Sequence, residues 1–182
     1  SEAQLQRTVD ATTDGIWSWN FTNNELFFSS KYYTMLGYEP DEFPPTYENW
    51  VGLIHPDDRD QALAVAAEYL KTKPDLYENE FRLRTRDGDY RWIQARARVS
   101  ERDEKGEAVR MIGNHVDVTD KKQAEEAQQK SDKRLKLALD SVSDAVWDWR
   151  VDTGEVYFSS RWYTMLGYEP YELPQSFDTW RN

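Results

Sequence analysis

The sequence contains no cysteine and only two histidines, His55 and His115, among its 182 residues. Without cysteine there is no disulfide framework, zinc ribbon, iron–sulfur cluster, thiol nucleophile or cysteinyl-flavin adduct. Two histidines do not suit a typical metal site with two or three histidine ligands, so we expect no metal. The longest apolar run, residues 62–67, is far shorter than the roughly 20 residues of a membrane helix, and no signal peptide is recognised. We therefore expect no membrane contact within this segment.

Positive charge is also scarce, because 23 Lys and Arg residues face 34 Asp and Glu residues, for a net charge of −11. Such a chain repels phosphate backbones and anionic membrane surfaces, so nucleic acid is not an expected partner. In contrast, 8 Trp and 11 Tyr residues supply ample material for a packed core. The composition predicts a folded protein of the cytoplasm.

An internal repeat organises the chain. Residues 14–50 and 144–180 align without a gap at an offset of 130 positions, and 18 of these 37 positions are identical. A match of this length is not a compositional accident, and both ends of the sequence resemble cut points in a longer polypeptide. The predicted segments are an N-terminal flanking helix in residues 1–13, a complete unit in 14–120, a connector helix in 121–143 and an incomplete second unit in 144–182.

The connector has no Gly or Pro and is rich in helix-forming residues. Its small or apolar residues are spaced by three or four positions, at Ala124, Ala127, Ser131, Leu135, Ala138 and Val142. This spacing fits a solvated connector helix and a parallel two-chain coiled coil equally well. Together with Leu5 and Val9 before the first unit, it favours a homodimer formed through the flanking helices.

Five segments of the first unit alternate apolar and polar residues, which predicts half-buried strands. They lie near residues 17–21, 25–28, 77–83, 93–99 and 109–118. The pair Asp87-Gly88 predicts a two-residue hairpin turn between the third and the fourth strand.

Two helices are predicted between the second and the third strand. Ser29 or Ser30 can cap a short helix, Lys31–Leu36, which Gly37 ends. After an irregular aromatic stretch up to Trp50, a longer helix begins at Pro56 and stops at Lys73-Pro74. Its predicted buried stripe is Leu63, Ala66, Ala67 and Leu70. This order of elements predicts an α+β domain with its helices on one face of an antiparallel sheet.

Four motifs together resemble those of a PAS domain with its C-terminal PAC portion. They are Met35–Pro40 (MLGYEP), residues 55–59 (His-Pro-Asp-Asp-Arg), Arg84–Ile93 (RTRDGDYRWI) and residues 117–119 (Asp-Val-Thr). The resemblance implies a five-stranded antiparallel sheet in the order 2-1-5-4-3. It also implies a bacterial multidomain signalling protein, either a sensor histidine kinase of a two-component system or a diguanylate cyclase or phosphodiesterase. The enzymatic output domain is then expected outside this chain, which is itself no enzyme.

Such a fold places a candidate pocket between the sheet and the helices. The residues with suitable position are Trp19, Phe28, Tyr33, Trp50, Ile54, Leu70, Phe81, Ile93 and Ala95. Small residues at Ala95 and Ala97 favour a cavity, but we expect the aromatic side chains to fill it nearly completely. No cofactor is predicted.

Each histidine has a structural and a functional interpretation. His55 directly precedes Pro56, so it is expected at the helix N-cap and not as a haem ligand. Asp57 and Asp58 then lie in the first turn, where acidic residues oppose the helix dipole and need no metal. His115 lies on the last strand, where we expect a neighbouring group to satisfy it.

The favoured function is that of a sensory and dimerisation module. A change at the sheet would pass through Asp117 and Thr119, with Thr119 as N-cap of the following helix, to a downstream output domain. The alternatives are a receptor for a small molecule or cofactor and a pure protein-interaction scaffold. In the short second unit, we expect Trp147 or Trp149 to contact the first unit or another molecule, because 39 residues cannot bury its aromatic side chains.

Overall fold

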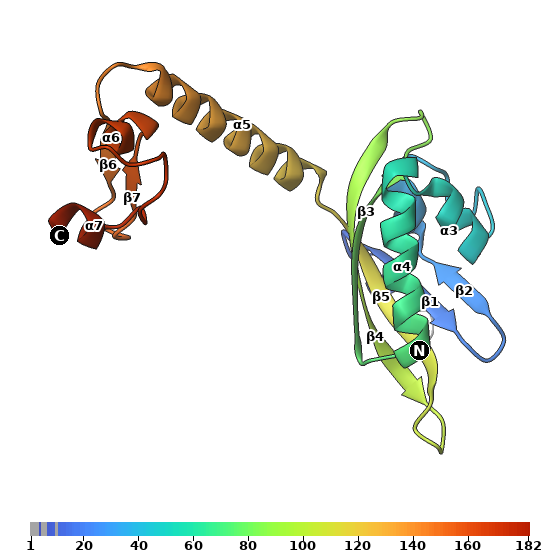
Figure 1. Cartoon of the computed structure of the whole chain (residues 1–182). Helices are drawn as coiled ribbons and strands as arrows, with labels where there is room; N and C mark the ends of the chain where they lie inside the picture. The colour runs from blue at the N-terminus through green and yellow to red at the C-terminus, as the bar shows by residue number, and fades with distance from the viewer. Residues whose placement is uncertain (1–3, 5–6, 10) are drawn as a thin grey trace. The chain divides into compact units, whose positions relative to one another are not determined.

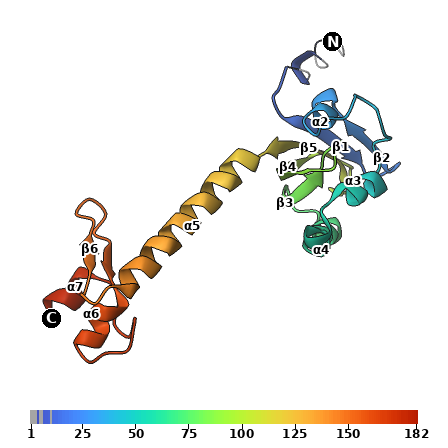
Figure 2. The same ribbon diagram turned by 90° about the horizontal axis from the view of Figure 1, so that it is seen from above.

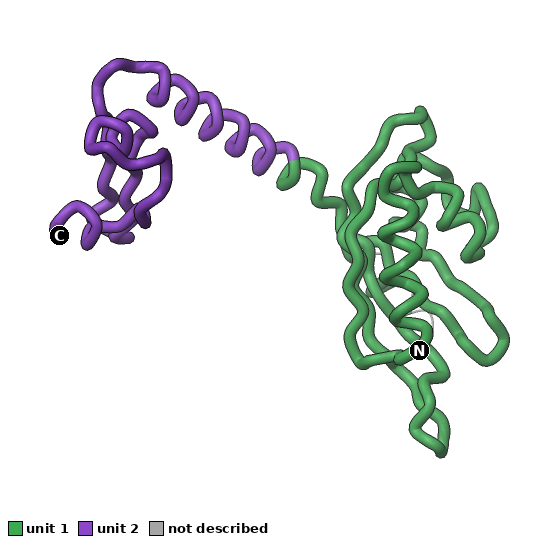
Figure 3. The backbone as a smooth tube through the Cα atoms, viewed as in Figure 1, with its two compact units in different colours: residues 1–122 green, residues 123–182 purple. Residues whose placement is uncertain are grey.

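The computed structural model describes residues 4, 7–9 and 11–182. These residues form two compact units, residues 1–122 and residues 123–182 (Figure 3). Of the predicted N-terminal helix, residues 4 and 7–9 are described and are helical, whereas Leu5 lies outside the described residues.

The first unit is built on a five-stranded antiparallel sheet in the order β2-β1-β5-β4-β3 (Figure 1). Its strands are β1 (Gly15–Asn20), β2 (Glu25–Phe28), β3 (Leu76–Arg84), β4 (Tyr90–Arg102) and β5 (Ala108–Asp117). This confirms both the α+β class and the predicted strand order. The sheet brings the first strand beside the last, with Gly15 opposite His115 and Asn20 opposite Arg110.

The alternation in β3 places one row of side chains in the core. Tyr77, Asn79, Phe81 and Leu83 are buried, as the period of two predicts. The predicted two-residue turn after this strand is wrong. Arg84 pairs with Tyr90, and the Thr85 N–H donates to the Asp89 carbonyl at 2.8 Å, so the loop is longer. Gly88, at φ +91°, supplies the left-handed residue of this longer turn.

Three helices lie between β2 and β3, namely α2 (Ser30–Thr34), α3 (Tyr47–Leu53) and α4 (Pro56–Thr72). Helix α2 is capped by the Ser29 hydroxyl, which accepts the Tyr32 N–H, and Gly37 follows it at φ +83°, as predicted. Helix α3 lies where the sequence predicted an irregular stretch. Thr46 initiates it, because its side chain accepts the Asn49 N–H.

Helix α4 packs against the inner face of the sheet (Figures 1 and 2). The predicted stripe of this helix was partly wrong: the residues buried are Ala62, Ala66 and Tyr69, whereas Ala67 is exposed. The helix also contacts β3 through polar groups, because the Asn79 side-chain amide donates to the Ala62 carbonyl at 3.0 Å.

The second unit contains β6 (Trp147–Trp149), β7 (Val156–Phe158), α6 (Ser160–Met165) and α7 (Phe177–Arg181). The long helix α5 (Thr119–Ser141) starts at the end of the first unit and forms the first part of the second; it has no buried residue. The end of α5 is fixed to the second unit by Asp140, whose carboxylate accepts the Ser160 N–H at 2.9 Å.

The second unit repeats the local geometry of the first. The Ile16 N–H donates to the Ser29 hydroxyl at 2.9 Å, and the Val146 N–H donates to the Ser159 hydroxyl at 3.0 Å. The stacked ring pair Phe28–Tyr32, with centroids 3.9 Å apart, recurs as Phe158–Trp162 at 4.0 Å. The sequence repeat is therefore also a structural repeat.

Candidate functional site

A small cavity of about 50 Å³ lies between the sheet, α2, α3 and α4 of the first unit. Its lining is almost entirely aromatic or apolar and comprises Trp17, Trp19, Leu26, Phe28, Tyr32, Tyr47, Trp50, Ala66, Tyr69, Leu70, Tyr77, Phe81, Met111 and His115. Ligand pockets for drug-sized molecules usually measure about 300–1,000 Å³. The aromatic side chains thus nearly fill the interior, as the sequence predicted.

Five of the nine predicted pocket residues line this cavity, namely Trp19, Phe28, Trp50, Leu70 and Phe81. The other four, Tyr33, Ile54, Ile93 and Ala95, are buried in the same core but lie away from the cavity. The other lining residues were not among those predicted; they are Trp17, Leu26, Tyr32, Tyr47, Ala66, Tyr69, Tyr77, Met111 and His115. Tyr77 could have been found, because it lies four residues before Phe81 on the same face of β3.

Three lining side chains carry a buried polar atom without a hydrogen-bond partner among the described residues. These atoms are Trp17 Nε1, the Tyr69 hydroxyl and His115 Nδ1. Buried polar groups are nearly always paired in folded proteins, and an unpaired one costs about 1–3 kcal/mol. All three atoms belong to residues that line the cavity, and buried polar groups of this kind are commonly satisfied by ordered water.

His115 is enclosed by aromatic rings. Its ring centroid lies 4.8 Å from that of Tyr32, 5.7 Å from Phe81 and 5.9 Å from Trp17. Burial lowers the pKa of His115 to about 3, so the imidazole is neutral at physiological pH. The expectation that a neighbouring group satisfies this histidine is wrong for Nδ1, because the adjacent side chains are rings and the strand partners are Gly15 and Ala95.

Tyrosine hydroxyls around the cavity are likewise held neutral. The Asn79 amide donates to the Tyr77 hydroxyl at 2.8 Å, and burial raises the pKa of Tyr77 to about 12. Burial also raises the pKa of Tyr32 and of Tyr69. The cavity is consequently an uncharged environment with a few hydrogen-bonding groups.

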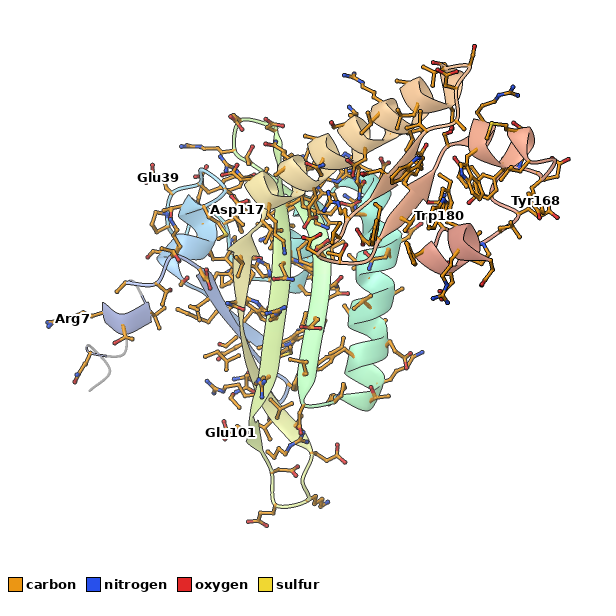
Figure 4. The ribbon with its side chains drawn as sticks, turned by 90° about the vertical axis from the view of Figure 1, so that its left-hand side faces the viewer. Arg7, Glu39, Glu101, Asp117, Tyr168 and Trp180 are labelled. Carbon is orange, nitrogen blue, oxygen red and sulfur yellow. The ribbon has the colours of Figure 1, made fainter. Side chains whose placement is uncertain are left out.

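A second polar cluster lies outside the cavity, where β5 ends and α5 begins (Figure 4). The Asp117 carboxylate accepts the Thr119 N–H at 3.0 Å and the Thr119 hydroxyl at 2.6 Å, and it pairs with Arg91 at 3.1 Å. The Thr119 hydroxyl accepts the backbone N–H of Trp92 at 2.9 Å. Helix α5 begins at Thr119, so this residue is the first of the helix and not its N-cap, which corrects the prediction. Its side chain ties α5 to β4.

Trp92 is the centre of this junction. Its carbonyl accepts the Val118 N–H at 2.8 Å, and the cationic groups of Arg82 and Lys122 each lie 5.1 Å from its ring centroid. Lys122, on the first turn of α5, also pairs with Glu80 of β3. The tryptophan therefore contacts charged groups of β3 and of α5 at the same time.

Arg82 extends this junction to the N-terminus of α4. Its guanidinium donates to both carboxylate oxygens of Asp58, at 2.7 and 2.8 Å, and its backbone N–H donates to the same carboxylate at 2.9 Å. These hydrogen bonds lower the pKa of Asp58. His55 is confirmed as the N-cap of α4, since its Nδ1 accepts the Asp57 N–H at 3.1 Å. This use of Nδ1 assigns His55 a structural role.

In the part of the chain that the structure describes, no group of three or more metal-ligating side chains is arranged to hold an ion. Within the same residues, no helix is both long and apolar enough to cross a bilayer.

Both units of the repeat match models of known protein families. The family model described as "PAS fold" matches residues 25–115, and the one described as "PAS domain" matches residues 133–182. A solved structure of a sensory box histidine kinase/response regulator from Burkholderia thailandensis is 37% identical, with a TM-score of 0.58. The match covers 73% of this chain and 98% of that structure.

Curated relatives are much longer than this chain. The protein described as probable diguanylate cyclase DgcE of Escherichia coli is 33% identical over 134 residues, which are 72% of this chain and 12% of that protein. A blue-light-activated histidine kinase of Brucella anthropi is 30% identical over 125 residues, 69% of this chain and 24% of that protein. The chain thus spans at most a quarter of the length of these two relatives.

Proposed function

Because the chain belongs to the PAS family and is a signalling sensor module, we propose that its first unit reports a change in its core to helix α5 through the Trp92 junction. The junction consists of Trp92, Asp117, Thr119, Lys122 and Arg82. The observation that carries the proposal is the hydrogen bond from the Trp92 N–H to the Thr119 hydroxyl, which joins a core strand to the first residue of α5.

The route from cavity to helix is short. His115 lines the cavity, and two residues further along β5 lies Asp117, which binds Thr119. On β4, Ile93 is buried in the core and pairs with Asp117, while the adjacent Trp92 binds Thr119. A shift of β4 or β5 caused by the cavity would therefore change the hydrogen bonds that hold the start of α5.

The partners of the module follow from its place in a longer signalling chain. We propose a homodimer formed through α5, with exposed apolar side chains at Leu135 of this helix and at Val142, which directly follows its last residue. The output is proposed to be a histidine kinase or a diguanylate cyclase, because relatives with these activities contain the matched region. Both activities lie outside the aligned PAS segment, so the module itself is proposed to be non-catalytic.

A double-mutant experiment tests the route. Ala66→Leu would enlarge a cavity-lining side chain, and Thr119→Val would remove the hydroxyl that binds the Trp92 N–H. Amide hydrogen exchange is then measured at Trp92 and at the first turn of α5. We expect Ala66→Leu to change exchange at that turn only when Thr119 is present, so that the two substitutions are not additive.

The matched control is Thr72→Val, which removes a hydroxyl that bonds only within α4. It should leave the response to Ala66→Leu unchanged. A response at the first turn of α5 that survives Thr119→Val would contradict the proposed route, as would the absence of any response to Ala66→Leu in a chain with intact core protection.

The second candidate function is reception of a small neutral ligand in the cavity. It is favoured by the three unpaired atoms of Trp17, Tyr69 and His115, which offer a donor, a hydroxyl and an imidazole nitrogen. A charged ligand would lack a counter-ion, since the lining contains no charged side chain at neutral pH. Native mass spectrometry of freshly purified protein tests this, because a bound molecule adds a discrete mass that Ala66→Leu should abolish. A spectrum with the bare chain mass in both proteins would contradict it.

A further inference from the structure

A surface groove of the first unit lies apart from the core cavity, between the end of α2 and the turn that joins β3 to β4. It measures about 540 Å³, which is within the range of about 300–1,000 Å³ that is usual for small-molecule sites. Its lining residues are Thr34, Met35, Leu36, Gly37, Thr85, Arg86, Asp87 and Arg91.

Two arginines lie in the wall of this groove. Arg86 belongs to the turn and Arg91 is the second residue of β4, and their side chains are 55% and 49% exposed. The whole chain carries a net charge of −11, so two cations in one groove reverse the prevailing charge locally. Such a site attracts an anionic ligand.

Arg86 is held in place from one side only. Its Nε pairs with Glu42 Oε1 at 3.2 Å, and the other oxygen of this carboxylate accepts the Glu39 N–H at 2.8 Å. The backbone N–H of Arg86 donates to the Leu36 carbonyl at 3.0 Å. Among the described residues, the two terminal nitrogens of Arg86 have no partner. They are therefore available to the oxygens of a ligand carboxylate.

Arg91 is held in the same manner. Its Nη1 pairs with Asp117 Oδ2 at 3.1 Å, and the other oxygen of that carboxylate accepts the Thr119 N–H at 3.0 Å. Nε and Nη2 of Arg91 have no partner within the part of the chain that the structure describes. Figure 4 shows Glu39 and Asp117 at the same end of the first unit. Both guanidinium groups are thus oriented before a ligand binds, which lowers the entropic cost of binding.

The acidic groups around the groove limit the charge that a ligand can carry. Asp87 lines the groove, and the hydrogen bond from the Thr85 hydroxyl lowers the pKa of its carboxyl group, so it is ionised at neutral pH. Glu42 and Asp117 lie beside the two arginines. These three carboxylates would repel a phosphate dianion more strongly than a single carboxylate.

We propose that this groove binds a small monocarboxylic acid, whose carboxylate lies between Arg86 and Arg91. The carboxylate offers one oxygen to each guanidinium, and the apolar body of the acid contacts Met35, which is half-buried at the end of α2. The site uses none of the residues that line the core cavity.

Binding acts on α5 as well, and this step rests on the proposed function. Arg91 pairs with the Asp117 carboxylate that binds both the N–H and the hydroxyl of Thr119. A ligand carboxylate competes for Arg91, which weakens its attraction to Asp117 and alters the contacts that hold the first turn of α5.

A titration with sodium hexanoate tests the site. The probe is added to the ¹⁵N-labelled full chain at pH 7 and constant ionic strength, and the backbone amide and arginine Nε–H resonances are followed by NMR. We expect saturable shifts at Met35, Arg86 and Arg91. Hexanamide, the neutral isostere, should cause no saturable shift, and inorganic phosphate should bind at least about tenfold more weakly.

Substitutions locate the binding site. Arg86→Gln and Arg91→Gln should each raise the dissociation constant of hexanoate at least about threefold. Arg98→Gln is the matched control, because Arg98 is exposed on the same strand as Arg91 but lies outside the lining. It should leave the constant unchanged. Arg91→Gln also removes the pair with Asp117, so Arg86→Gln is the deciding variant, and thermal unfolding verifies that each variant is folded.

Amide hydrogen exchange at residues 119–122 reports the link to α5. We expect saturating hexanoate to change this exchange in the parent chain and not in Arg86→Gln. Binding that requires Arg86 but leaves the exchange unchanged would overturn the link and retain the site. Neither result depends on the response to Ala66→Leu, so the proposed route from the core is tested separately.

Four results would overturn the site itself. They are the absence of a saturable shift with hexanoate, equal binding of hexanamide, tighter binding of phosphate, and an unchanged dissociation constant in folded Arg86→Gln.

Discussion

Arg82 and Asp58 form a bidentate ion pair that joins β3 to the first turn of α4, with N–O distances of 2.7 and 2.8 Å. A third hydrogen bond, from the Arg82 backbone N–H, reaches the same carboxylate. The guanidinium also lies 5.1 Å from the centroid of the Trp92 ring. The Asp58 carboxylate thereby positions the Arg82 side chain, which contacts Trp92 in the Trp92 junction.

We expect Asp58→Asn to destabilise the first unit by about 1.5–3 kcal/mol, the usual value of hydrogen bonds to a charged group. The hydrogen bonds from Arg82 lower the folded-state pKa of Asp58, so its contribution is present above the unfolded pKa near 4 and is lost as the pH falls through the folded value. Urea unfolding at pH 7 and at a series of acidic pH values measures both effects. Equal acid sensitivity in Asp58→Asn and the parent would contradict this assignment.

Gly37 is expected to resist substitution because its φ is +83°. Gly37→Val should destabilise the first unit by at least about 1 kcal/mol, since a β-branched residue fits the left-handed region poorly. Gly52→Val in α3 is the matched control, because a Cβ there meets no atom within 4 Å and the backbone φ is not positive. Thermal unfolding compares the two variants, and equal melting temperatures would show that the conformation of Gly37 is not limiting.

Self-association should depend on the exposed apolar residues of α5 and of Val142, which directly follows this helix. Leu135 is 60% exposed and Val142 is 44% exposed, although both are apolar. The double substitution Leu135→Glu and Val142→Glu is expected to weaken a homodimer, because it places negative charge in the apolar contact between the two paired helices. Sedimentation velocity over a concentration series measures this. An unchanged dimer, or a parent chain that stays monomeric at high concentration, would refute the role of α5 in association.

The purified protein should be colourless above the tryptophan absorption band. His55 caps α4 through Nδ1 and does not line the cavity, which at about 50 Å³ is far too small for haem or flavin. Absorption spectra of freshly purified protein test the prediction. A Soret or flavin band of near-stoichiometric intensity would show that the core opens to admit a cofactor.

The sequence predicted the fold where its signal was periodic or local. Alternation located the strands, and the Ser29 and Pro56 signals located the starts of α2 and α4. Helix α3 was missed because its cap, Thr46, is followed three residues later by Asn49 instead of the Glu or Gln of a capping box. The hairpin after β3 was predicted too short, because the Thr85–Asp89 hydrogen bond depends on the pairing of two whole strands.

The site was harder to predict than the fold. Parity along a strand identifies which side chains face the core, but the cavity occupies only part of the core. Tyr33 and Ile93 have the correct parity or location and are buried, yet they do not line it. The unpaired state of His115 likewise results from rings contributed by α2, β1 and β3, which no local pattern reveals.

The absence of Gly and Pro from α5 has a consequence for the rotational orientation of the residues that follow this helix. This helix is continuous for 23 residues from Thr119, and a straight helix advances about 1.5 Å and 100° per residue. The gain or loss of a single residue of helix at Thr119 would therefore rotate everything beyond it by about 100°. The effect of an insertion within α5 should then depend on the rotation that is left after whole turns are subtracted. Seven residues make about two full turns, so they should be tolerated far better than two residues.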